Sequence, residues 1–392
     1  MKFTTLGILT LAASMMAGSQ ATAQQPAIKI GFIGTFSGSG AAFGEDMYDA
    51  FMLFVEGNGG KLGGIPVQVV RKDSQFKPEV ANQVADELLD RENVSIIIGV
   101  TFSNEMLAIY QKVTSREVYI IGSNASPSQL AGAQCSPFYF NTNAQNDQRA
   151  EAAGKYMLDA GYKHVYTMAP NYQAGKDYMA GFKRYYKAAL LNEVYTPLSQ
   201  LDFQAELTQM AAAKPDAVYA FYPGGLGVQF IRQWRQAGLA GTIPLVTGST
   251  VDGLTLPALK EDAVGVAHFA PWGPDFDNPQ SKKFVADFDA KHKRLPSEYA
   301  ASAYDSATLL DSAIAAVKGN LSDKQSFTAA LKAADFRSVK GKFKFNHNHM
   351  PIEDFFAFEI IKDGNKDRYT HKTIGVAMAD AVDAYQAECR MK

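Results

Sequence analysis

Hydroxyl and glycine residues follow a stretch of alternating apolar residues that begins at Ile28, and these residue types suit the binding of an anion. Residues 28–44 read IKIGFIGTFSGSGAAFG, so apolar residues give way to a Gly/Ser turn and then to a helical pattern. We expect a buried strand, a polar turn and a helix start there. Because a helix N-terminus presents unpaired N–H groups and the positive end of the helix dipole, the turn suits a carboxylate or a phosphate.

Three further polar turns follow predicted strands in the same way. Together the four turns span residues 36–40, 101–104, 123–126 and 222–225. Ligands of open parallel sheets bind outside the carboxyl ends of the strands. We therefore expect these turns to meet at one ligand site.

Aromatic residues lie close to these turns or to neighbouring predicted strand ends, and they supply candidate apolar walls. They are Phe36, Phe43, Phe102, Tyr172, Tyr222 and Trp272. A pocket with apolar walls and a few directed polar groups is typical of small-molecule sites. For each single ring, a position in the core or at a lobe interface remains the alternative.

Other kinds of site find little support in the sequence. The glycines of residues 38–44 follow a strand, but their spacing and the distant Asp73 depart from the dinucleotide-binding fingerprint. The chain has no G-x-S-x-G elbow and no HExxH motif, so no hydrolytic centre is predicted. His347 and His349 have H-x-H spacing without a nearby acidic or cysteine ligand, which favours a solvated turn over a metal site.

Alternating strands and helices must position these residues. Strands are expected at 28–33, 67–74, 94–100, 118–122, 164–170, 216–222, 243–249, 264–271, 343–346 and 354–364. Helices are expected at 44–56, 78–92, 105–116, 146–161, 176–191, 228–238, 282–292, 299–317 and 324–334. This alternation indicates an α/β protein with right-handed crossovers and parallel sheets, and the residues after 364 are interpreted as a polar tail.

The pattern restarts near the middle of the chain. GEDMYDAF at residues 44–51 and GKDYMAGF at residues 175–182 share their glycine, their aspartate and their closing phenylalanine. An internal repeat of one strand–helix unit implies two similar lobes, as the length of the chain also favours.

Residues 1–23 have the three parts of a secretory signal peptide. A cation at Lys2 precedes an apolar run, and Ala21-Thr22-Ala23 gives a small-x-small cleavage site before Gln24. We expect a soluble, exported protein with no lipid anchor. Its 38 Lys and Arg residues are scattered and balanced by 40 Asp and Glu residues, which argues against a nucleic-acid or anionic-membrane partner.

The chain has two cysteines, Cys135 and Cys389. In an oxidising compartment an even pair favours a disulfide, which would fix the C-terminal tail to the first half of the chain. Two unpaired thiols are the alternative, because the sequence does not supply the geometry that a bridge requires.

At TFSN (101–104), SNASPSQL (123–130) and YPGG (222–225) the sequence resembles the type I periplasmic solute-binding proteins of ABC importers, in the family of the leucine/isoleucine/valine-binding protein. The resemblance implies two Rossmann-like lobes joined by crossover segments, with a ligand trapped between them by hinge closure and no chemical step. It implies lobe 1 at 24–143 plus 271–347, lobe 2 at 144–270 plus 348–380, and a tail at 381–392. The implied state is a periplasmic monomer without a cofactor that delivers its ligand to a membrane permease.

The same resemblance assigns residues to the ligand. Hydroxyls and backbone amides of the family hold a carboxylate at positions that match Phe102, Ser103, Asn124, Ala125 and Ser126. Second-lobe contacts of the family match Tyr172, Tyr222 and residues 247–250, which include Gly248 and Ser249.

One departure from the family concerns the ligand class. The Gly-Pro-Glu pattern of branched-chain amino-acid binders stands here as Gly248-Ser249-Thr250, so the acidic partner of a ligand ammonium is missing. Asp147 is a candidate replacement. FNTNAQNDQ (140–148) and the C-terminal Cys389-Arg390-Met391 resemble the branch that binds aromatic acids such as benzoates and hydroxycinnamates. A branched-chain amino acid or amide, a ligand-sensing module of this fold and a secreted enzyme are the alternatives.

Overall fold

The computed structural model describes Met1, residues 26–364 and residues 366–391. The predicted cleavage site after Ala23 lies outside the described residues, as does the predicted leader except for Met1. Among the described residues, no helix combines the length and the apolar character that crossing a membrane requires.

The first lobe is built on a six-stranded sheet with the order β2-β3-β1-β4-β5-β6. Its strands are β1 (Ile28–Gly34), β2 (Lys61–Leu62), β3 (Ile65–Asp73), β4 (Ile96–Gly99), β5 (Tyr119–Gly122) and β6 (Tyr139–Asn141). All neighbouring strands are parallel except the short β2 hairpin partner of β3. The predicted β–turn–α units therefore end at one edge of this sheet.

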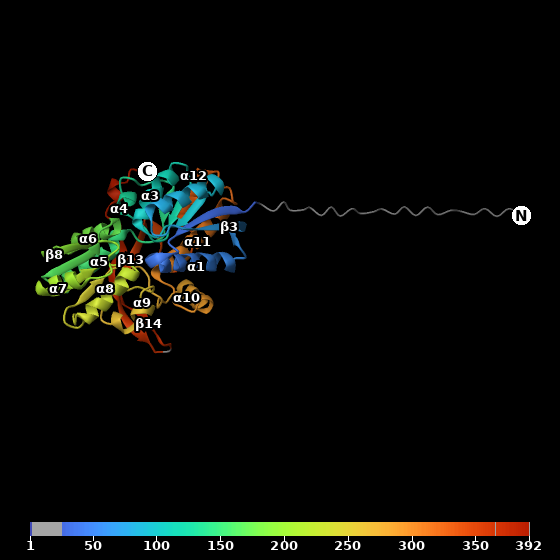
Figure 1. The fold of residues 1–392 in the computed structure, drawn as a ribbon. Coiled ribbons are helices and arrows are strands. Elements are labelled where there is room, and N and C mark those ends of the chain that lie inside the picture. Colours follow the sequence, from blue (N-terminus) through green and yellow to red (C-terminus); the bar gives the residue numbers. More distant parts are fainter. Residues whose placement is uncertain (2–25, 365, 392) are drawn as a thin grey trace.

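Helices cover both faces of the first sheet (Figure 1). One face packs against α1 (Ala41–Gly57), α10 (Pro279–His292), α11 (Glu298–Ala316) and α12 (Lys324–Ala333). The other face packs against α2 (Pro78–Asp86), the short π-helical turn Glu87–Arg91, α3 (Ser103–Thr114) and α4 (Ser128–Ala131). β4 is buried along its whole length because both of its faces are covered.

The second lobe is built on an eight-stranded mixed sheet. Its strands are β7 (Val165–Pro170), β8 (Leu190–Thr196), β9 (Ala217–Ala220), β10 (Leu245–Thr247), β11 (Ala267–Ala270), β12 (Lys344–Phe345), β13 (Pro351–Asp363) and β14 (Arg368–Ala381). The order is β12-β13-β11-β10-β9-β7-β8, and β14 pairs with β13. β7 to β11 are parallel, whereas β13 joins β11 in the antiparallel direction.

The helices of the second lobe also lie on two faces of its sheet. α5 (Asn146–Asp159) and α6 (Gln173–Tyr185) share one apolar core with β7, β9 and β13. α7 (Gln204–Ala212), α8 (Gly225–Gln236) and α9 (Leu256–Leu259) share another with the opposite sides of β7 and β9. The predicted α/β class with two Rossmann-like lobes is confirmed, with antiparallel strands added at the sheet edges.

The repeated sequence motif takes the same structure in both lobes. A Cβ atom at Gly44 would lie 2.2 Å from the carbonyl oxygen of Thr35, and one at Gly175 would lie 1.9 Å from that of Pro170. Each glycine therefore lets the first turn of a helix approach the end of the preceding strand. Asp46 and Asp177, two residues further on, are both buried and both accept hydrogen bonds from serine residues.

The interpretation of the residues after 364 as a polar tail was wrong. Arg368–Ala381 forms β14, which pairs with β13 over most of its length. Several residues of β14, such as Ile374 and Val376, are exposed because its outer side faces solvent. A half-exposed edge strand lacks the continuous apolar pattern of a buried strand, and the sequence therefore gave little sign of it.

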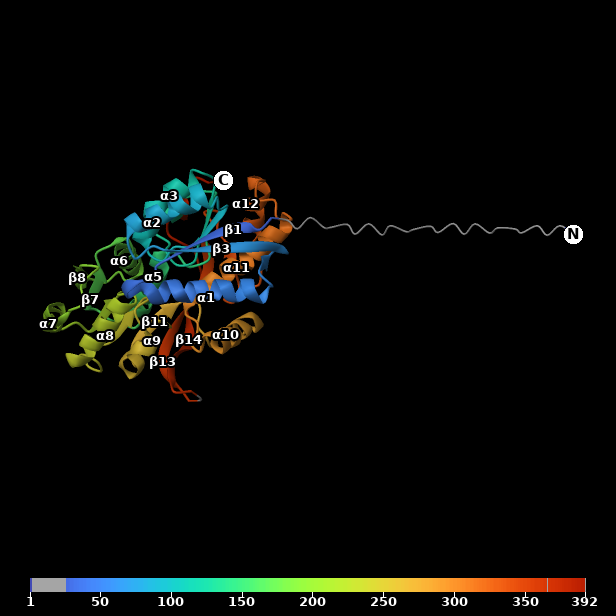
Figure 2. The same cartoon turned by 45° about the vertical axis from the view of Figure 1, so that its right-hand side comes forward.

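The chain passes between the lobes three times and then returns to the first. The crossings lie between β6 and α5, between β11 and α10, and between α12 and the β12–β13 pair. After β14 the C-terminus lies on the first lobe near α3 and α12 (Figures 1 and 2). Cys135 and Cys389 form a disulfide there, with Cα atoms 5.6 Å apart, which confirms the predicted pairing.

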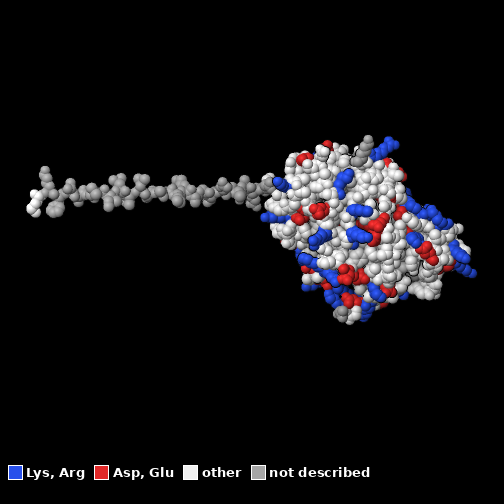
Figure 3. Space-filling view, turned by 180° about the vertical axis from the view of Figure 1, so that it is seen from behind, with Lys and Arg blue, Asp and Glu red and all other residues white. Residues whose placement is uncertain are grey.

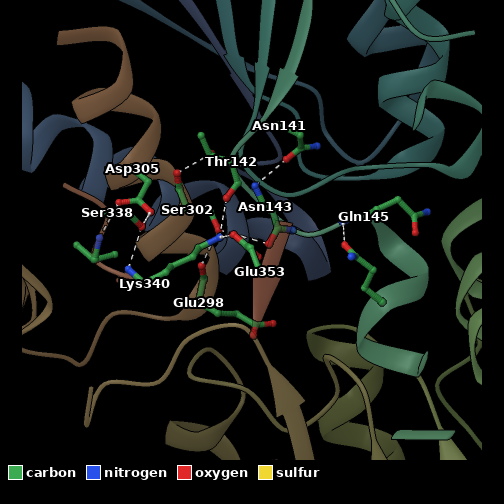
Figure 4. A network of polar contacts seen from close by, with 12 residues as sticks. Asn141, Thr142, Asn143, Gln145, Glu298, Ser302, Asp305, Ser338, Lys340 and Glu353 are labelled. Atoms are coloured by element: carbon green, nitrogen blue, oxygen red, sulfur yellow. Dashed lines mark hydrogen bonds and ion pairs between the residues drawn. The ribbon is translucent and has the colours of Figure 1, made fainter. Parts of the chain in front are cut away.

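A buried lysine ties two of these crossings together. Lys340 Nζ donates to the backbone oxygen of Thr142 and to Glu353 Oε1, both at 2.6 Å. Figure 4 shows this lysine amid side chains from the first and third crossings and from α11. In the same network Asp305 accepts from Val339 N at 3.0 Å and from the hydroxyl of Ser338.

Charges of both signs are interspersed on the protein surface. Figure 3 shows Lys and Arg side chains beside Asp and Glu side chains across one face of the molecule. Many of them form ion pairs, such as Lys183 with Glu193 and Lys112 with Asp86. The face in this view therefore lacks the extended patch of one sign that steers a polyanion.

Candidate functional site

A narrow cavity between the two lobes gathers residues from the predicted turns. Seven predicted residues line it: Phe43, Phe102, Ser103, Asn124, Ala125, Tyr172 and Ser249. Thr101, Asn146, Ala174, Tyr178, Phe221, Pro223 and Tyr299 are the other lining residues. Three of the four predicted turns contribute, because β4, β5 and β9 end at edges that face each other across the cleft.

Hydrogen bonds fix the two turns of the first lobe. Asn124 Nδ2 donates to the carbonyl oxygen of Thr101 at 2.7 Å, and the backbone N–H of Thr35 donates to Thr101 Oγ1 at 2.9 Å. Glu105, in the first turn of α3, accepts from the backbone N–H of Phe102 at 3.1 Å. The start of α3 is therefore held in place, and Ser103 is its first residue.

Ser103 meets the second lobe directly across the cavity. Asn146 Nδ2, in the first turn of α5, donates to Ser103 Oγ at 3.0 Å and to Asp177 Oδ2 at 2.9 Å. Because Ser103 Oγ accepts in this contact, its hydroxyl hydrogen stays available to a ligand acceptor. The cavity thus has a hydroxyl donor next to a helix N-terminus, which is a favourable place for a carboxylate.

Three parallel aromatic rings form the wall of the second lobe. The ring centroids of Tyr178 and Phe221 are 3.8 Å apart with an interplanar angle of 13°. Tyr172 and Phe221 are 6.3 Å apart with an angle of 15°. The hydroxyls of Tyr178 and Ser249 lie 2.7 Å apart, so this wall combines flat apolar faces with one polar edge.

The facing wall belongs to the first lobe and is also aromatic. Phe43 of α1 lies 5.6 Å from Phe102 and 4.9 Å from Tyr299 between ring centroids. It also touches the second lobe, since a Cβ atom at Gly224 would lie 2.8 Å from its ring. Gly224 also has φ +55°, a conformation that favours glycine. This interlobe contact therefore requires glycine both for its backbone conformation and for the space that a Cβ atom would take from the Phe43 ring.

The lining of the cavity is uncharged. Among the described residues that line it there is no Asp, Glu, Lys, Arg or His. Asp177 lies behind the lining and is bound by Asn146, Ser128 and Gln173. Burial raises the pKa of Asp177 to about 6, and the nearby Asp147 raises it in the same direction.

The guanidinium group of Arg149 is buried behind the lining of the same cavity. Arg149 of α5 donates to Glu298 Oε1 at 3.1 Å and to Asn143 Oδ1 at 2.8 Å. Asn143 in turn donates to the backbone oxygen of Asn124 at 2.8 Å. Glu298 precedes Tyr299 at the start of α11, so Arg149 connects two lining segments. Although burial opposes it, Arg149 and neighbouring groups hold the pKa of Glu298 down at about 2.

Comparison with known proteins explains this arrangement. The profile of the periplasmic binding protein family matches residues 27–365. The chain belongs to the periplasmic binding protein family. Members of this family bind solutes and are not enzymes, so the protein is a solute-binding protein.

Three relatives match this periplasmic binding protein over most of its length. A solute-binding protein of an ABC transporter from R. palustris, solved in complex with benzoate, is 30% identical, has a TM-score of 0.87 and covers 93% of this chain and 100% of its own. The Leu/Ile/Val-binding protein homolog 6 of Brucella melitensis is 26% identical over 95% of each chain. A leucine-binding protein from Thermotoga maritima is 21% identical with a TM-score of 0.79, and the match covers 90% of this chain and 99% of its own.

Five predicted ligand residues do not line the cavity in this periplasmic binding protein. They are Phe36, Ser126, Tyr222, Gly248 and Trp272. Phe36 packs under the guanidinium of Arg71, whose Cζ lies 3.7 Å from the ring centroid. Trp272 is buried in the first lobe, where its indole N–H donates to Ser281 Oγ at 2.9 Å.

The other three of these residues lie close behind the lining. Ser126 is fully buried, and its hydroxyl donates to the sulfur of Met350 at 3.3 Å, away from the cavity. Tyr222 is buried on the α7/α8 side of its sheet and accepts from Thr196 Oγ1 at 3.2 Å. A Cβ atom at Gly248 would lie 2.9 Å from Tyr178 and from the hydroxyl of Tyr219, so the residue allows close packing there.

The carboxylate of Asp147 accepts hydrogen bonds from residues outside the cavity lining. Its Oδ2 accepts from Arg184 at 2.9 Å and from the hydroxyl of Tyr385 at 2.8 Å, and its Oδ1 accepts from Gln145 at 3.0 Å. It is fully buried and is not part of the cavity lining. The candidate replacement for the missing acidic residue therefore lies outside the cavity.

Sequence reasoning missed Phe221, Tyr178, Asn146 and Tyr299. Phe221 lines the cavity in place of the predicted Tyr222, because neighbouring residues at the end of a strand point to opposite faces. Tyr178 lies within the repeated motif at residues 175–182, which was a usable signal. Asn146 and Tyr299 reach the site through the crossings between the lobes. Asn146 lies within FNTNAQNDQ (140–148), the stretch that resembles the aromatic-acid branch, whereas no local pattern marks Tyr299.

The two histidines of the H-x-H pair lie in different environments. His349 is buried, stacks on Phe140 at 3.9 Å between centroids, and contacts the backbone oxygen of Tyr139. His347 is exposed beside Asn346. Among the described residues no group of three or more His, Cys, Asp or Glu side chains is arranged to hold a metal ion.

Proposed function

We propose that the protein captures a small aromatic carboxylate, of the benzoate or hydroxycinnamate type, in the periplasm and delivers it to the permease of an ABC importer. The benzoate-bound R. palustris protein, a component of an ABC transporter, supports this role through its 30% identity over 93% of the chain. The uncharged, aromatic lining of the interlobe cavity is the observation that carries the choice of ligand.

The absence of an acidic residue from the described lining of the cavity favours a simple carboxylate over an α-amino acid as the ligand. An α-amino acid brings an ammonium group, and burying this group without a carboxylate partner is costly. The lining offers none, and Asp147 is bound by Arg184 and Tyr385. A simple carboxylic acid does not carry this penalty.

Groups of the first lobe suit the carboxylate itself. We assign it to the hydroxyl of Ser103, the N-terminus of α3 and the turn of Asn124 and Ala125, where donors and the helix dipole favour a negative charge. The flat body of the ligand would then lie between Phe43 and Phe102 on one side and the parallel rings of Tyr172 and Phe221 on the other.

Binding in this scheme accompanies hinge closure of the two lobes. We propose that the moving bodies are residues 24–143 plus 271–347 and residues 144–270 plus 348–380, with residues 381–392 as a tail and with a monomer as the functional unit. Capture of a branched-chain amino acid or amide is the alternative, favoured by the similarity to the Brucella melitensis Leu/Ile/Val-binding protein homolog 6.

Calorimetric titration of refolded, ligand-stripped protein tests the proposal with pairs of compounds that differ only in an α-ammonium group. The pairs are 3-phenylpropanoate with phenylalanine and 4-methylpentanoate with leucine, and benzoate, 4-hydroxybenzoate and coumarate complete the panel. We expect the aromatic acids to bind and each ammonium-bearing partner to bind at least about tenfold more weakly. Tighter binding of leucine or phenylalanine than of its matched acid would reject the proposed ligand class and favour the alternative.

A further inference from the structure

A second cavity lies between the lobes, apart from the one proposed to hold the transported ligand. It has a volume of about 340 Å³, within the range of small-molecule sites. α1 forms one side, and α9, the start of β14 and residues 293–296 form the other. Figure 2 shows α1 lying across the molecule above α9, α10 and β14.

The inner surface of this cavity is largely apolar. Leu254, Leu256, Pro257, Leu295 and Tyr369 contribute to it. None of the described residues that line this cavity lines the cavity of Ser103 and Tyr178, so the two sites are separate.

The acidic side chains at the cavity are already paired. Glu45 forms an ion pair with Arg71, and Asp46 forms one with Arg294 and also accepts from Ser297. Asp367 is strongly exposed and lies 3.4 Å from Lys362. No described acid at this cavity is left with its charge uncompensated.

Two lysines at the cavity have no acidic partner. Lys260 makes no side-chain hydrogen bond or ion pair among the described residues, and Lys293 Nζ donates only to the backbone oxygen of Ala290, at 2.8 Å. Both side chains are exposed, so they lie at the open edge of the cavity. The unbalanced charge of the cavity is therefore positive.

The backbone at these lysines is unusual. Lys260 has φ 48° and Lys293 has φ 57°, in the left-handed region that residues with a side chain rarely adopt. Each lysine directly follows a helix, α9 or α10, where a positive φ is a common way for a helix to end. The two lysines border the same cavity from two different segments of the chain.

We propose that this cavity is a second binding site, for an amphipathic organic anion. The apolar body of the ligand lies against Leu254, Leu295 and Tyr369, and its acidic group lies between Lys260 and Lys293. Because Lys293 and Leu295 follow α10 of the first lobe and Tyr369 lies in β14 of the second, such a ligand contacts both lobes at once. The proposal does not depend on which solute occupies the cavity of Ser103.

Fluorescence titration with 8-anilinonaphthalene-1-sulfonate, an organic anion with an apolar body, tests the site in the natively folded protein. We expect saturable binding of one dye molecule and about fivefold or greater weakening in Lys260→Glu, because the substitution reverses a charge at the edge of the cavity. Lys214→Glu is the matched control. Lys214 is also an exposed lysine in the left-handed region, with φ 52°, and it lies away from the cavity.

Three results would overturn the proposal. One is an absence of saturable binding to the wild-type protein, and another is equal weakening by Lys260→Glu and Lys214→Glu. The third is loss of dye binding in Ser103→Phe, with unchanged binding in Lys260→Glu, because the dye would then occupy the other interlobe cavity. Circular dichroism of each variant verifies that the folded state is retained.

Discussion

Asn146 and Ser103 join the two lobes across the ligand cavity. Asn146 Nδ2 donates to Ser103 Oγ at 3.0 Å, and the same amide nitrogen donates to the buried carboxyl group of Asp177 at 2.9 Å. A polar residue of each lobe is thus held in place before any ligand group reaches the Ser103 hydroxyl.

Replacing Ser103 with alanine should weaken carboxylate binding without unfolding the protein. A hydrogen bond to a charged group contributes about 1.5–3 kcal/mol, so the dissociation constant should rise roughly tenfold to a hundredfold. Ser126→Ala is the control, because the Ser126 hydroxyl is directed to Met350. Calorimetric titration compares the two variants, and an equal loss of affinity in both would remove Ser103 from the role proposed for it.

An acidic residue placed in the cavity should change the preferred ligand class. Ser249 has φ 54°, a conformation that aspartate tolerates, and its neighbour Tyr178 can donate to a carboxylate. We expect Ser249→Asp to bind aromatic acids at least about tenfold more weakly and to gain affinity for phenylalanine, since the new charge repels one and pairs with the other. The uncharged Ser249→Asn variant should show no such gain, and a gain in both would contradict the electrostatic explanation.

Reduction of the Cys135–Cys389 disulfide should destabilise the protein. The two cysteines are separated by 254 positions, and closing so long a loop contributes roughly 5 kcal/mol in the chain-entropy model. The melting temperature should fall when a reductant is added to the wild-type protein and should not respond to it in a Cys135→Ser/Cys389→Ser variant. An unchanged melting temperature of the wild type after verified reduction would contradict this prediction.

Glu105 should make the folded state less stable as the pH rises towards neutrality. Burial raises the pKa of Glu105 to about 7, against the opposing effect of hydrogen bonds that include those from Phe102 and Thr35. The folded protein therefore holds a proton there that the unfolded chain releases near pH 4.5, so the stabilisation is complete below that pH and is lost as the pH rises through 7.

Denaturant unfolding at pH 5 and pH 8 measures this effect. Glu105→Gln keeps an acceptor for the backbone N–H of Phe102 but does not titrate, so it should show a smaller decrease in stability between the two pH values than the wild type. The same decrease in both proteins would show that Glu105 does not titrate in this range.

Lys340 should be the most sensitive single position of the crossings. It is buried between Thr142 and Glu353, and Figure 4 shows the surrounding network. Lys340→Met leaves the Glu353 carboxylate buried without its partner, which typically costs about 3–5 kcal/mol. Lys340→Met/Glu353→Gln should recover most of that stability. Denaturant unfolding of the four proteins gives the coupling energy, and additive losses would contradict a direct interaction.

The periodicity of apolar residues and the local turn residues were enough to predict the fold class and part of the candidate site from the sequence. Alternating strands and helices indicated parallel sheets, and the repeat at residues 44–51 and 175–182 indicated two lobes. The turns of Ser103 and of Asn124 also followed from sequence, because a residue directly after a buried parallel strand must lie at the ligand-binding edge of the sheet. The number of cysteines and the expected oxidising compartment favoured a disulfide, and the structure supplied the geometry that pairs Cys135 with Cys389.

Only the tertiary structure decided which side chains face the ligand. Phe221 rather than Tyr222 lines the cavity because a strand alternates its faces, and the sequence does not say which face is turned to the cleft. Asn146 and Tyr299 enter through crossings whose path depends on the packing of the lobes. Asp147 is adjacent to Asn146 in sequence, yet Arg184 and Tyr385 hold it away from the cavity, since partners distant along the chain determine where a buried charge is stable.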